Sequence, residues 1–554
     1  MNPLFNFLIH LRMVLTGRLL WRPFLRQTQD PEAAQRQVLR SILQRHQATA
    51  FGREHRFAEI ATPEEYAARV PIRTYEDLRP YIERQEEHKS PELVAEQPIM
   101  YARTSGTTGQ AKYIPILPDT IVRYRRNQRI FSCCHHAAIP GLFSGKTLAF
   151  VSPAVEGRLP TGTPYGSMSG LIYQSMPRLL RRKYLVPPAV FECPDHELKY
   201  LLIATFALAE RTITFIAGAN PSTFLKIAGV IRTRSEEIVA AVESGTLPGR
   251  REWDAKLHAA AQAQFHRNPR RAEELRALFR AQREVTFSEL WPGLKAVSCW
   301  REGSCRVLLP ALRRQLNENV AVVELGYLAS ECRGSIPVDS RRHLEVPTLH
   351  ENYFEFIARE DWESGRHRVH SLAQLEVGRA YYVIVTTPDG LYRYFMNDVV
   401  VVDGCFNRTP TIKFLEKGAG ATNITGEKLY ESQVCEAVEA VQRARGWSAG
   451  FFLLVAEPER QCYRFYLEEP DGKLDGFAAQ LDAELAARNL EYQAKRESGR
   501  LRPIELKILR PGAGDAYKAH LVAQGQRESQ FKFLRLQSRS KLAFDFETHL
   551  VVPR

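Results

Sequence analysis

Helical and strand patterns alternate along most of this chain, and this alternation constrains the fold more than any other feature. Helical periodicity over residues 30–90 is followed by two strand patterns joined by a glycine-rich loop (98–116). A helix over 119–139 and an apolar strand at 146–154 come next, and a further helix is expected over 305–316. Because strands that alternate with helices pack into sheets covered by those helices, the pattern predicts an α/β architecture.

A second unit is indicated near the C-terminus. Residues 414–427 are rich in Gly, Thr and Asn, a composition typical of a hinge or a domain boundary. The patterns that follow predict a compact α+β unit of a size able to fold alone. We expect helices over 428–445 and 474–490 and strands over 450–457, 462–468 and 503–509.

The charge balance is basic, with 76 Lys and Arg against 63 Asp and Glu and a formal net charge of +13. Such an excess is compatible with nucleic acid, an anionic membrane or anionic substrates. The denser basic stretches, 250–283 and 488–541, show no aromatic-interleaved RNA-binding signature and no helix-turn-helix pattern. We interpret the excess as a solvated basic surface and expect no nucleic-acid partner.

The nine cysteines are odd in number, and none of them form a CxxC pair. They are interpreted as mostly buried thiols of a reducing compartment, which predicts a cytoplasmic protein. The run Cys133-Cys134-His135-His136 has metal-binding residue types, but adjacent side chains cannot all converge on one ion. We therefore expect this run to be part of a helix.

Residues 4–25 are apolar but carry Arg12, Arg18 and Arg22. A signal peptide places its charges ahead of an uninterrupted apolar stretch, and a spanning helix needs about 20 residues without such charges. The segment is expected to be an amphipathic helix, and packing on the body of the protein is favoured over association with a membrane.

A small-residue loop between two strands is the strongest local signal. Glycines and hydroxyls let backbone N–H groups approach a polyphosphate closely, and a lysine supplies compensating charge. The loop is not a Walker A loop, because GxxxxGK[ST] is absent. The alternative is a polar hairpin turn. The candidate residues are Thr104, Ser105, Gly106, Thr107, Thr108, Gly109 and Lys112.

Two further stretches follow apolar strands. In Gly326–Glu331, Tyr327 could stack on a purine and Glu331 could hold Mg²⁺, at the strand end where open α/β sheets place ligands. In Gly390–Asp398, Asp398 is placed to accept both hydroxyls of a ribose. Taken alone, each carboxylate would be read as an ordinary solvated residue.

In this order the three stretches resemble the acyl-CoA synthetase and luciferase superfamily of adenylate-forming enzymes. More narrowly, the chain is similar to the auxin-responsive-promoter (Gretchen Hagen) family of acyl-acid amido synthetases, in its bacterial form. The resemblance covers essentially the whole chain. It rests on TAFGREHRF, VPIRTYEDLRPYIER, TSGTTGQAKYIPI, ELWPGLKAVSCW, GYLASE, GLYRYFMNDVV, FLEKGAGATNITGEKLYESQV and SQFKFLRL.

The resemblance implies roles for individual residues. The loop Thr104–Lys112 would bind the triphosphate, Tyr327 would lie near adenine with Ser330 in the same motif, Glu331 would face Mg²⁺ and Asp398 would bind the ribose. A lysine of the mobile C-terminal domain would act at the acyl-adenylate. Lys532, in Gln530-Phe531-Lys532-Phe533-Leu534-Arg535, fits that role, and Lys518 is the rival.

Two departures from the family pattern stand out. The family commonly has Tyr-Arg-x-Gly-Asp, whereas this chain has Phe395 and Asn397 in the arginine and glycine positions. Arg393, two residues earlier than Phe395, is a possible substitute for that arginine. Lys417 stands where an arginine is common.

The resemblance implies an α/β fold with a large multi-sheet adenylation domain (1–415) and a small mobile α+β cap (416–554). It implies that ATP, with Mg²⁺, activates a carboxylic acid as an acyl-adenylate. The acyl group then passes to an amine, and an amino acid is the expected acceptor. Lys532, Lys112 and Glu331 would offset developing charge. Two alternatives are transfer to CoA or a carrier thiol, and a non-catalytic relative that binds membranes peripherally.

The acyl group should occupy a pocket built from about 145–175, 215–225 and the segment Trp300–Glu302. The stretch Thr161–Ser167 is read either as a binding loop for this pocket or as an ordinary surface loop. No feature of the sequence selects one carboxylic acid.

Overall fold

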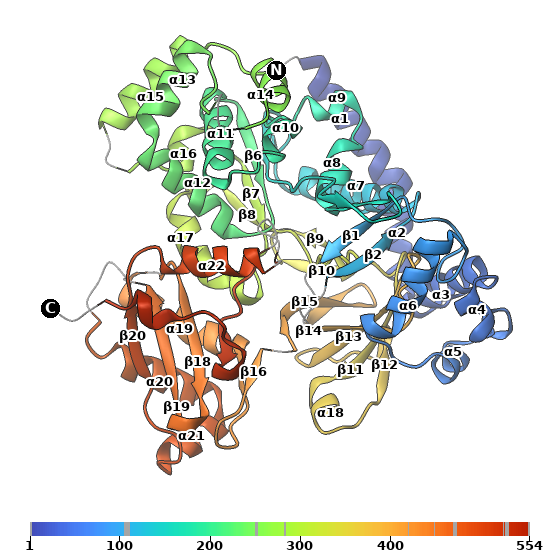
Figure 1. Ribbon diagram of the computed structural model, residues 1–554. Helices are drawn as coiled ribbons and strands as arrows, with labels where there is room; N and C mark the ends of the chain where they lie inside the picture. Colours follow the sequence, from blue (N-terminus) through green and yellow to red (C-terminus); the bar gives the residue numbers. More distant parts are fainter. Residues whose placement is uncertain are drawn as a thin grey trace.

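A computed structural model describes residues 3–104, 111–249, 253–281, 284–418, 420–447, 449–468, 474–524, 526 and 531–551. Four sheets of four or five strands organise the described part of the chain, three of them in the larger N-terminal part and one in the C-terminal part (Figure 1). Their positions relative to one another create the site described below.

Long apolar runs form a parallel sheet in the order β3-β6-β7-β8. Ile216 of β6 packs with helix α11 (His196–Ala209) and α12 (Pro221–Thr233), whereas its neighbour Phe215 packs with α7 (Thr120–Ala138). Both faces of the sheet are therefore buried, which is why its strands are apolar at successive positions. The strands are β3 Lys146–Ala149, β6 Ile213–Ala217, β7 Ala296–Cys299 and β8 Ala321–Glu324.

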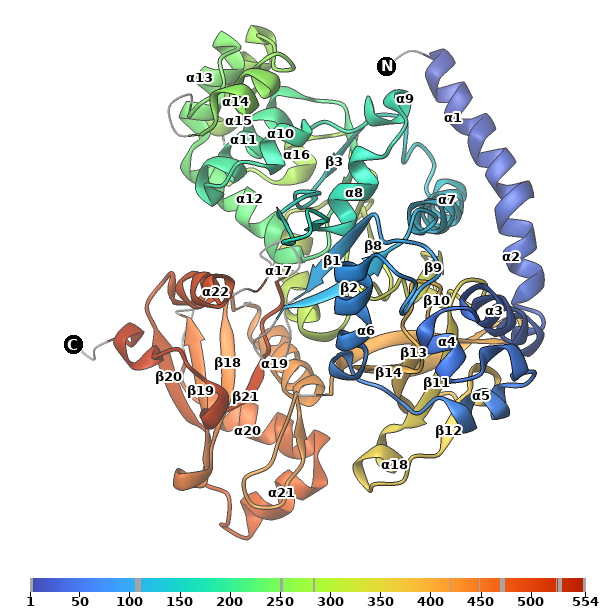
Figure 2. The same ribbon diagram turned by 45° about the vertical axis from the view of Figure 1, so that its right-hand side comes forward.

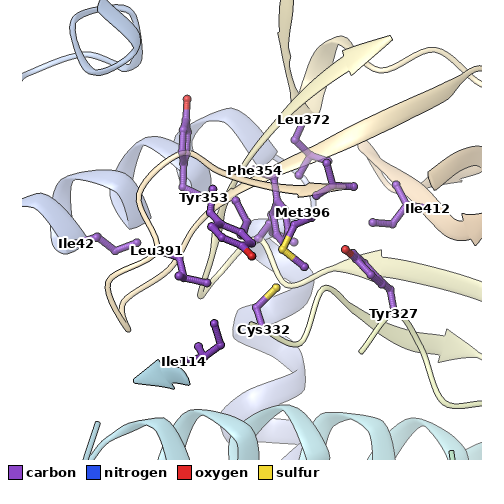
Figure 3. Packing of buried hydrophobic residues seen from close by; sticks show 14 of the residues in the cluster. Ile42, Ile114, Tyr327, Cys332, Tyr353, Phe354, Leu372, Leu391, Met396 and Ile412 are labelled. Atoms are coloured by element: carbon purple, nitrogen blue, oxygen red, sulfur yellow. The ribbon is translucent and has the colours of Figure 1, made fainter. Parts of the chain in front are cut away.

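The second large sheet is antiparallel, in the order β12-β11-β13-β14-β15. Ile42 of α3 (Pro31–His46), Ile114 of β2 and Phe354 of β11 belong to one core on this sheet, and Figure 3 shows Met396 and Tyr327 in the same cluster. The sheet thus joins the N-terminal helices to the cleft. Its strands are β11 Tyr353–Ala358, β12 Val369–Ser371, β13 Ala380–Thr386, β14 Tyr394–Phe406 and β15 Thr409–Lys417.

A smaller sheet, β2-β1-β5-β4, carries the glycine-rich loop between β1 (Met100–Thr104) and β2 (Lys112–Ile116). Its other two strands are β5 (Pro164–Gly166) and β4 (Gly157–Arg158). The antiparallel register places Thr104 directly opposite Lys112. Ser105, Gly106, Thr107, Thr108 and Gly109 lie outside the described residues. The two residues that flank them are held together by the hairpin.

The C-terminal sheet has the order β20-β19-β18-β21 and cores of its own. Phe465 of β19 packs against α19 and α20, and the adjacent Tyr466 packs with Tyr517 of α22 on the opposite face. In Figures 1 and 2, α22 lies at the end of this layer that faces α12 and α17. The elements are β18 Phe452–Glu457, β19 Cys462–Glu468, β20 Glu505–Leu509, β21 Leu536–Ser538, α19 Glu431–Arg445, α20 Phe477–Arg488, α21 Leu490–Glu497 and α22 Ala513–Ala523.

These elements confirm the predicted α/β class with an α+β C-terminal part. One predicted element differs. The helix expected over 305–316 is a 3₁₀ segment, Gly303–Leu308, followed by α17 (Leu309–Arg314). Pro310 lies in the first turn of α17, where its missing N–H costs no hydrogen bond, so that a new helix begins there.

The Cys133–His136 run lies within α7, as expected. His135 is buried and its Nδ1 is hydrogen-bonded to the carbonyl of Phe131 at 2.7 Å, while the other three side chains are half-buried. No group of three or more His, Cys, Asp or Glu residues in the described ranges could hold a metal ion. All nine cysteines are free thiols.

The N-terminal helix α1 (Pro3–Thr16) runs along α7 at the outside of the molecule (Figure 2). No helix in the part of the chain that the structure describes is long and apolar enough to cross a membrane. The remaining helices of five or more residues are α2 Arg22–Gln27, α4 Ala50–Glu54, α5 Pro63–Arg69, α6 Tyr75–His88, α8 Met168–Gln174, α13 Ser235–Ser244, α14 Ala255–Gln262, α15 Pro269–Ala281 and α18 Arg359–Glu363.

Candidate active site

A single cleft of about 920 Å³ brings the predicted residues together. Its walls come from the ends of β1 and β2, the carboxyl ends of the parallel strands, β14, β15 and the C-terminal segment 531–544. Ligands bind at the carboxyl edge of open parallel sheets because the strand-end loops diverge there. The predicted site residues that line the cleft are Thr104, Lys112, Tyr327, Ser330, Glu331, Asp398 and Lys532.

Lys112 projects from the start of β2 into the cleft, where its Nζ donates to the hydroxyl of Tyr394 at 3.1 Å. Burial lowers the pKa of Lys112, and the nearby charge of Lys417 lowers it further. No carboxylate of the described residues forms an ion pair with this ammonium. The electrostatic attraction between a bound anion and a partly desolvated ammonium group is stronger than that between the same anion and a fully hydrated ammonium group.

Tyr327 and Asp398 are in direct contact. The hydroxyl of Tyr327 donates to Oδ2 of Asp398 at 2.6 Å, and Nζ of Lys417 forms an ion pair with Oδ1 of the same carboxylate. The ring of Tyr327 stacks on Phe414, with centroids 6.0 Å apart and planes at 24°. Burial raises the pKa of Tyr327 well above its usual value, which keeps its hydroxyl proton available as a donor.

Ser330 and Glu331 lie in a tight turn after β8. The turn is closed by a bridge between Leu328 and Arg333 and by a hydrogen bond of 3.0 Å from the N–H of Ala329 to the carbonyl of Cys332. Both side chains line the cleft. No basic side chain of the described residues forms an ion pair with Glu331, so its carboxylate is available to a ligand.

Lys532 enters the cleft from the C-terminal part. Its Nζ lies 3.7 Å from the centroid of the Trp300 ring and 4.7 Å from that of Phe414, and burial lowers its pKa. The carbonyl of the preceding residue, Phe531, accepts a hydrogen bond of 2.5 Å from Asn220. Lys518, the rival, sits on α22 with Nζ 5.9 Å from the ring of Phe531 and does not line the cleft.

Arg393 does not substitute for the family arginine, so that expectation is wrong. Its Nε donates to both carboxylate oxygens of Glu355, at 3.1 and 3.0 Å, and its Nη1 donates to the carbonyls of Ala67 and Val70. The side chain is buried away from the cleft by these contacts. Charge next to Asp398 is supplied instead by Lys417.

Asn397 occupies the glycine position of the family pattern. Its φ of 52° lies in the left-handed region, which glycine adopts without strain and asparagine tolerates better than other residues. The departure therefore preserves the backbone conformation. In the arginine position, Phe395 stacks on Trp362 with centroids 4.3 Å apart and planes at 20°.

The end of the cleft near α7 and α8 is predominantly apolar, as expected for residues from 145–175 and 215–225. The loop Thr161–Ser167 does not line it; part of that stretch forms β5 (Pro164–Gly166), paired with β1. The apolar end is lined by Tyr124, Phe131, Ala149, Phe150, Val151, Met168, Ile172, Tyr173, Met176, Tyr184, Phe215 and Ala217.

Glu324, the last residue of β8, is a site residue that was not predicted from the sequence. Its carboxylate accepts the backbone N–H groups of Arg301 (2.6 Å), Leu325 (2.8 Å) and Gly326 (3.0 Å). It thereby ties the loop after β7, which carries Trp300, to the loop after β8. A glutamate inside an apolar strand was the signal that could have identified it.

The C-terminal wall was also missed. Tyr517, His520, Leu521 and Gln524 of α22 and its C-cap all line the cleft. Their spacing of three, one and three residues marks one face of a helix, and this periodicity was readable in the sequence. Lys518 lies off that face.

Domain matches cover most of the chain. Residues 21–321 match the GH3 family N-terminal domain, residues 346–417 the GH3 family central domain and residues 432–541 the GH3 family C-terminal domain. Among curated relatives, the probable indole-3-acetic acid-amido synthetase GH3.2 of Oryza sativa subsp. japonica is 24% identical, covering 92% of this chain and 89% of the relative. Indole-3-acetic acid-amido synthetase GH3.3 of Arabidopsis thaliana is 22% identical, covering 92% and 90%.

Solved structures give the same fold. The GH3.15 acyl acid amido synthetase in complex with 2,4-DB superimposes with a TM-score of 0.83 at 21% identity, covering 96% of each chain. A 2-hydroxyisobutyryl-CoA ligase in the postadenylation state superimposes with a TM-score of 0.53 at 14% identity, covering 93% of this chain and 92% of the other.

Proposed function

This chain belongs to the GH3 family, and from that premise we propose that it is an ATP-dependent acyl-acid amido synthetase. The enzyme would activate a carboxylic acid as an acyl-adenylate and transfer the acyl group to the amino group of an amino acid. The observation that supports this most directly is the convergence of Lys112, Tyr327, Asp398 and Lys532 in one cleft from four separate stretches of the chain.

The reaction proceeds in two steps. A carboxylate oxygen of the acid attacks the α-phosphorus of ATP, a new P–O bond forms, and the bond to the bridging oxygen breaks to release pyrophosphate. The amine nitrogen then attacks the acyl carbon, the C–O bond to AMP breaks, and the nitrogen loses a proton. No protein nucleophile is needed, because AMP serves as the leaving group.

The cleft residues serve the first step through charge. Lys112 and Lys532 are cations with little water around them, and both would stabilise the negative charge that develops on the phosphates. The carboxylate of Asp398 would accept the ribose hydroxyls. Tyr327, with its ring against Phe414, would lie beside the adenine and fix the Asp398 carboxylate through its hydroxyl.

The donor set fits Mg²⁺. Magnesium is usually held by one or two carboxylates together with substrate phosphates and water, not by a cage of protein ligands. Glu331 supplies one unpaired carboxylate in the cleft, and it would be the protein ligand. When bound, the ion would neutralise charge on the phosphates.

The acid substrate should be apolar. Most side chains at the end of the cleft beyond Trp300 are aromatic or aliphatic, with Gln128, Ser152 and Ser169 among the few polar ones, so that a charged acyl group would lose more hydration there than these groups replace. The relatives named for indole-3-acetic acid and the neighbour that holds 2,4-DB are consistent with an aromatic acid.

We further propose that residues 1–415 form the adenylation domain and residues 416–554 a mobile cap. Among the described residues between β15 and α19, the short pair β16 (Ala421–Thr422) and β17 (Leu429–Tyr430) is the only regular structure, which suits a hinge. Rotation about it would withdraw Lys532 and admit the amine. The nine free thiols suit a reducing compartment, for which the cytoplasm is the expected location.

Pyrophosphate exchange into ATP tests the first step. With a panel of aromatic and aliphatic carboxylic acids, at least one acid should support exchange in the wild type. Lys532→Ala should lower the exchange rate at least about a hundredfold, the scale of losing one transition-state charge partner. Lys518→Ala, on the neighbouring helix, is the matched control and should retain the rate. Exchange with no acid would contradict the proposal.

The acceptor is tested separately. Acyl-adenylate formed in a single turnover should be consumed by an amino acid with release of AMP and an amide, and CoA should leave it intact. If only CoA gave a product, the protein would be an acyl-CoA ligase, although the adenylation assignments would stand.

A further inference from the structure

The N-terminal helix has one side packed on the body. A continuous helical segment runs from Pro3 to Gln27, through a π-helical stretch Gly17–Trp21. On the packed side, a side chain at Gly17 would lie 3.6 Å from Sγ of Cys133 in α7, and Phe24 is buried, 1% exposed. These contacts fix the segment along the outside of the molecule, where Figure 2 shows it at the edge.

The other side of the same segment is apolar and exposed. The spacing of its large side chains, by one, three and four residues, is that of a stripe along one face of a helix. Apolar side chains left in water along such a stripe cost free energy that only a partner can recover. The exposed fractions are 60% for Phe7, 43% for Leu8, 44% for Leu11, 42% for Val14, 48% for Leu15 and 69% for Leu19.

The charges of this segment all have one sign. Arg12, Arg18, Arg22 and Arg26 are its arginines, and no Asp or Glu occurs before Asp30. Arg18, Arg22 and Arg26 are exposed, and Arg12 lies close enough to Arg129 of α7 that the second charge helps to lower its pKa. An apolar stripe accompanied only by arginines is the pattern of a helix that lies in the interface of an anionic membrane.

We propose that the exposed face of residues 7–26 docks on an anionic lipid surface. The apolar stripe would enter the boundary between headgroups and acyl chains, and the arginine side chains would extend to the lipid phosphates. A second copy of the chain suits this face less well, because pairing two such helices would bring eight arginines together with no acid to offset them.

Docking in this way would place the apolar end of the cleft close to the lipid. Arg129 and Cys133 of α7 face α1, whereas Tyr124, Gln128 and Phe131 on the other side of α7 line the cleft. The N-terminal helix and α7, each about 10 Å in diameter, therefore separate the docking face from the acyl pocket.

Vesicle co-sedimentation tests the proposal without reference to catalysis. The wild type should bind vesicles of phosphatidylcholine with 30% phosphatidylglycerol, chosen as the anionic probe. It should bind pure phosphatidylcholine vesicles at least about tenfold more weakly, and binding should weaken as salt is raised. Equal binding to both vesicle types, or no binding to either, would overturn the proposal.

Two triple variants separate the contribution of the apolar stripe from that of the arginine charges. Leu11→Ser, Leu15→Ser and Leu19→Ser combined should lower the anionic-vesicle partition coefficient at least about tenfold, as should Arg18→Gln, Arg22→Gln and Arg26→Gln combined. Leu490→Ser, at an 81% exposed leucine of α21, is the matched control and should have no effect. Unchanged binding in either triple variant would contradict the assignment.

Folding and self-association are checked on the same variants. All of the replaced side chains are exposed, so that the circular dichroism melting curves should match the wild type. Sizing without lipid should give the same mass for wild type and leucine variant. A wild-type dimer that the leucine variant abolishes would assign the face to a second copy and overturn the lipid proposal.

Discussion

The ammonium group of Lys532 lies 3.7 Å from the centre of the Trp300 ring. Lys532 belongs to the C-terminal part and Trp300 to the loop after β7, so that this contact closes the cleft between the two parts of the molecule. The lysine lies against aromatic faces, and no carboxylate of the described residues forms an ion pair with it, which leaves its charge available to a substrate anion.

Replacing the ring tests this contact. Trp300→Leu removes a cation–π interaction of about 0.5–2 kcal/mol and should lower the pyrophosphate exchange rate about 2- to 30-fold. Trp300→Phe keeps an aromatic face and should lie between wild type and the leucine variant. If the leucine variant matched the wild type, the contact would have no part in positioning Lys532.

The exchange rate should fall at high pH. Burial lowers the pKa of Lys532 and of Lys112, and both must be protonated to stabilise phosphate charge. The rate therefore holds below the lowered pKa values and declines as pH rises through them. An arginine stays charged at high pH, so Lys532→Arg should abolish the part of the alkaline decline that is caused by deprotonation of Lys532. Lys112→Arg should likewise abolish the part that is caused by deprotonation of Lys112. An alkaline decline unchanged in both variants would contradict the assignment.

The backbone at Asn397 allows a sharp pair of substitutions. Asn397→Gly retains the left-handed conformation and should have a melting temperature and ATP KM close to wild type. Asn397→Val forces a β-branched residue into it at a cost of about 1–2 kcal/mol. The strain lies beside Asp398, so the ATP KM should rise as the melting temperature falls. Equal melting temperatures of the two variants would show that the backbone at residue 397 can leave the left-handed region without a loss of stability.

The sequence allowed prediction of those parts of the site that short stretches encode. Thr104 and Lys112 meet because a hairpin register is local. Tyr327 follows the end of β8, and Asp398 lies near the start of β14 in another sheet, so each stretch places its own residue at the cleft. The fold class followed from the alternation of elements. The position of the acyl pocket was predicted only through the family resemblance, because an apolar run in the sequence does not distinguish a residue of the core from a residue that lines a pocket.

The unpredicted features depend on contacts across long sequence separations. Arg393 pairs with Glu355 of another strand, and no local pattern indicates that partner. Lys417 was noted as a departure, but its pairing with Asp398 depends on the register of β14 and β15. The N-terminal segment was expected to be an amphipathic helix packed on the body, and it does pack along α7; its exposed apolar stripe depends on which side faces α7, which the sequence does not indicate.

A last prediction concerns Glu431, the first residue of α19. Its Oε1 accepts the backbone N–H of Arg535 at 2.6 Å, three residues after Lys532, so that it helps to position the segment carrying that lysine. Burial raises the pKa of Glu431 to about 7. Between the unfolded pKa and this value the folded state holds more protons than the unfolded state, and its stability falls as pH rises.

Glu431→Gln cannot ionise but can still accept the Arg535 N–H. The difference in free energy of unfolding between this variant and the wild type, measured in urea, should therefore change in favour of the variant by up to about 3 kcal/mol as the pH rises from 5 to 8. Glu436→Gln on the same helix is the control, because its side chain is 44% exposed and solvent screens its charge. Parallel pH profiles for wild type and Glu431→Gln would show that Glu431 titrates alike in the folded and unfolded states.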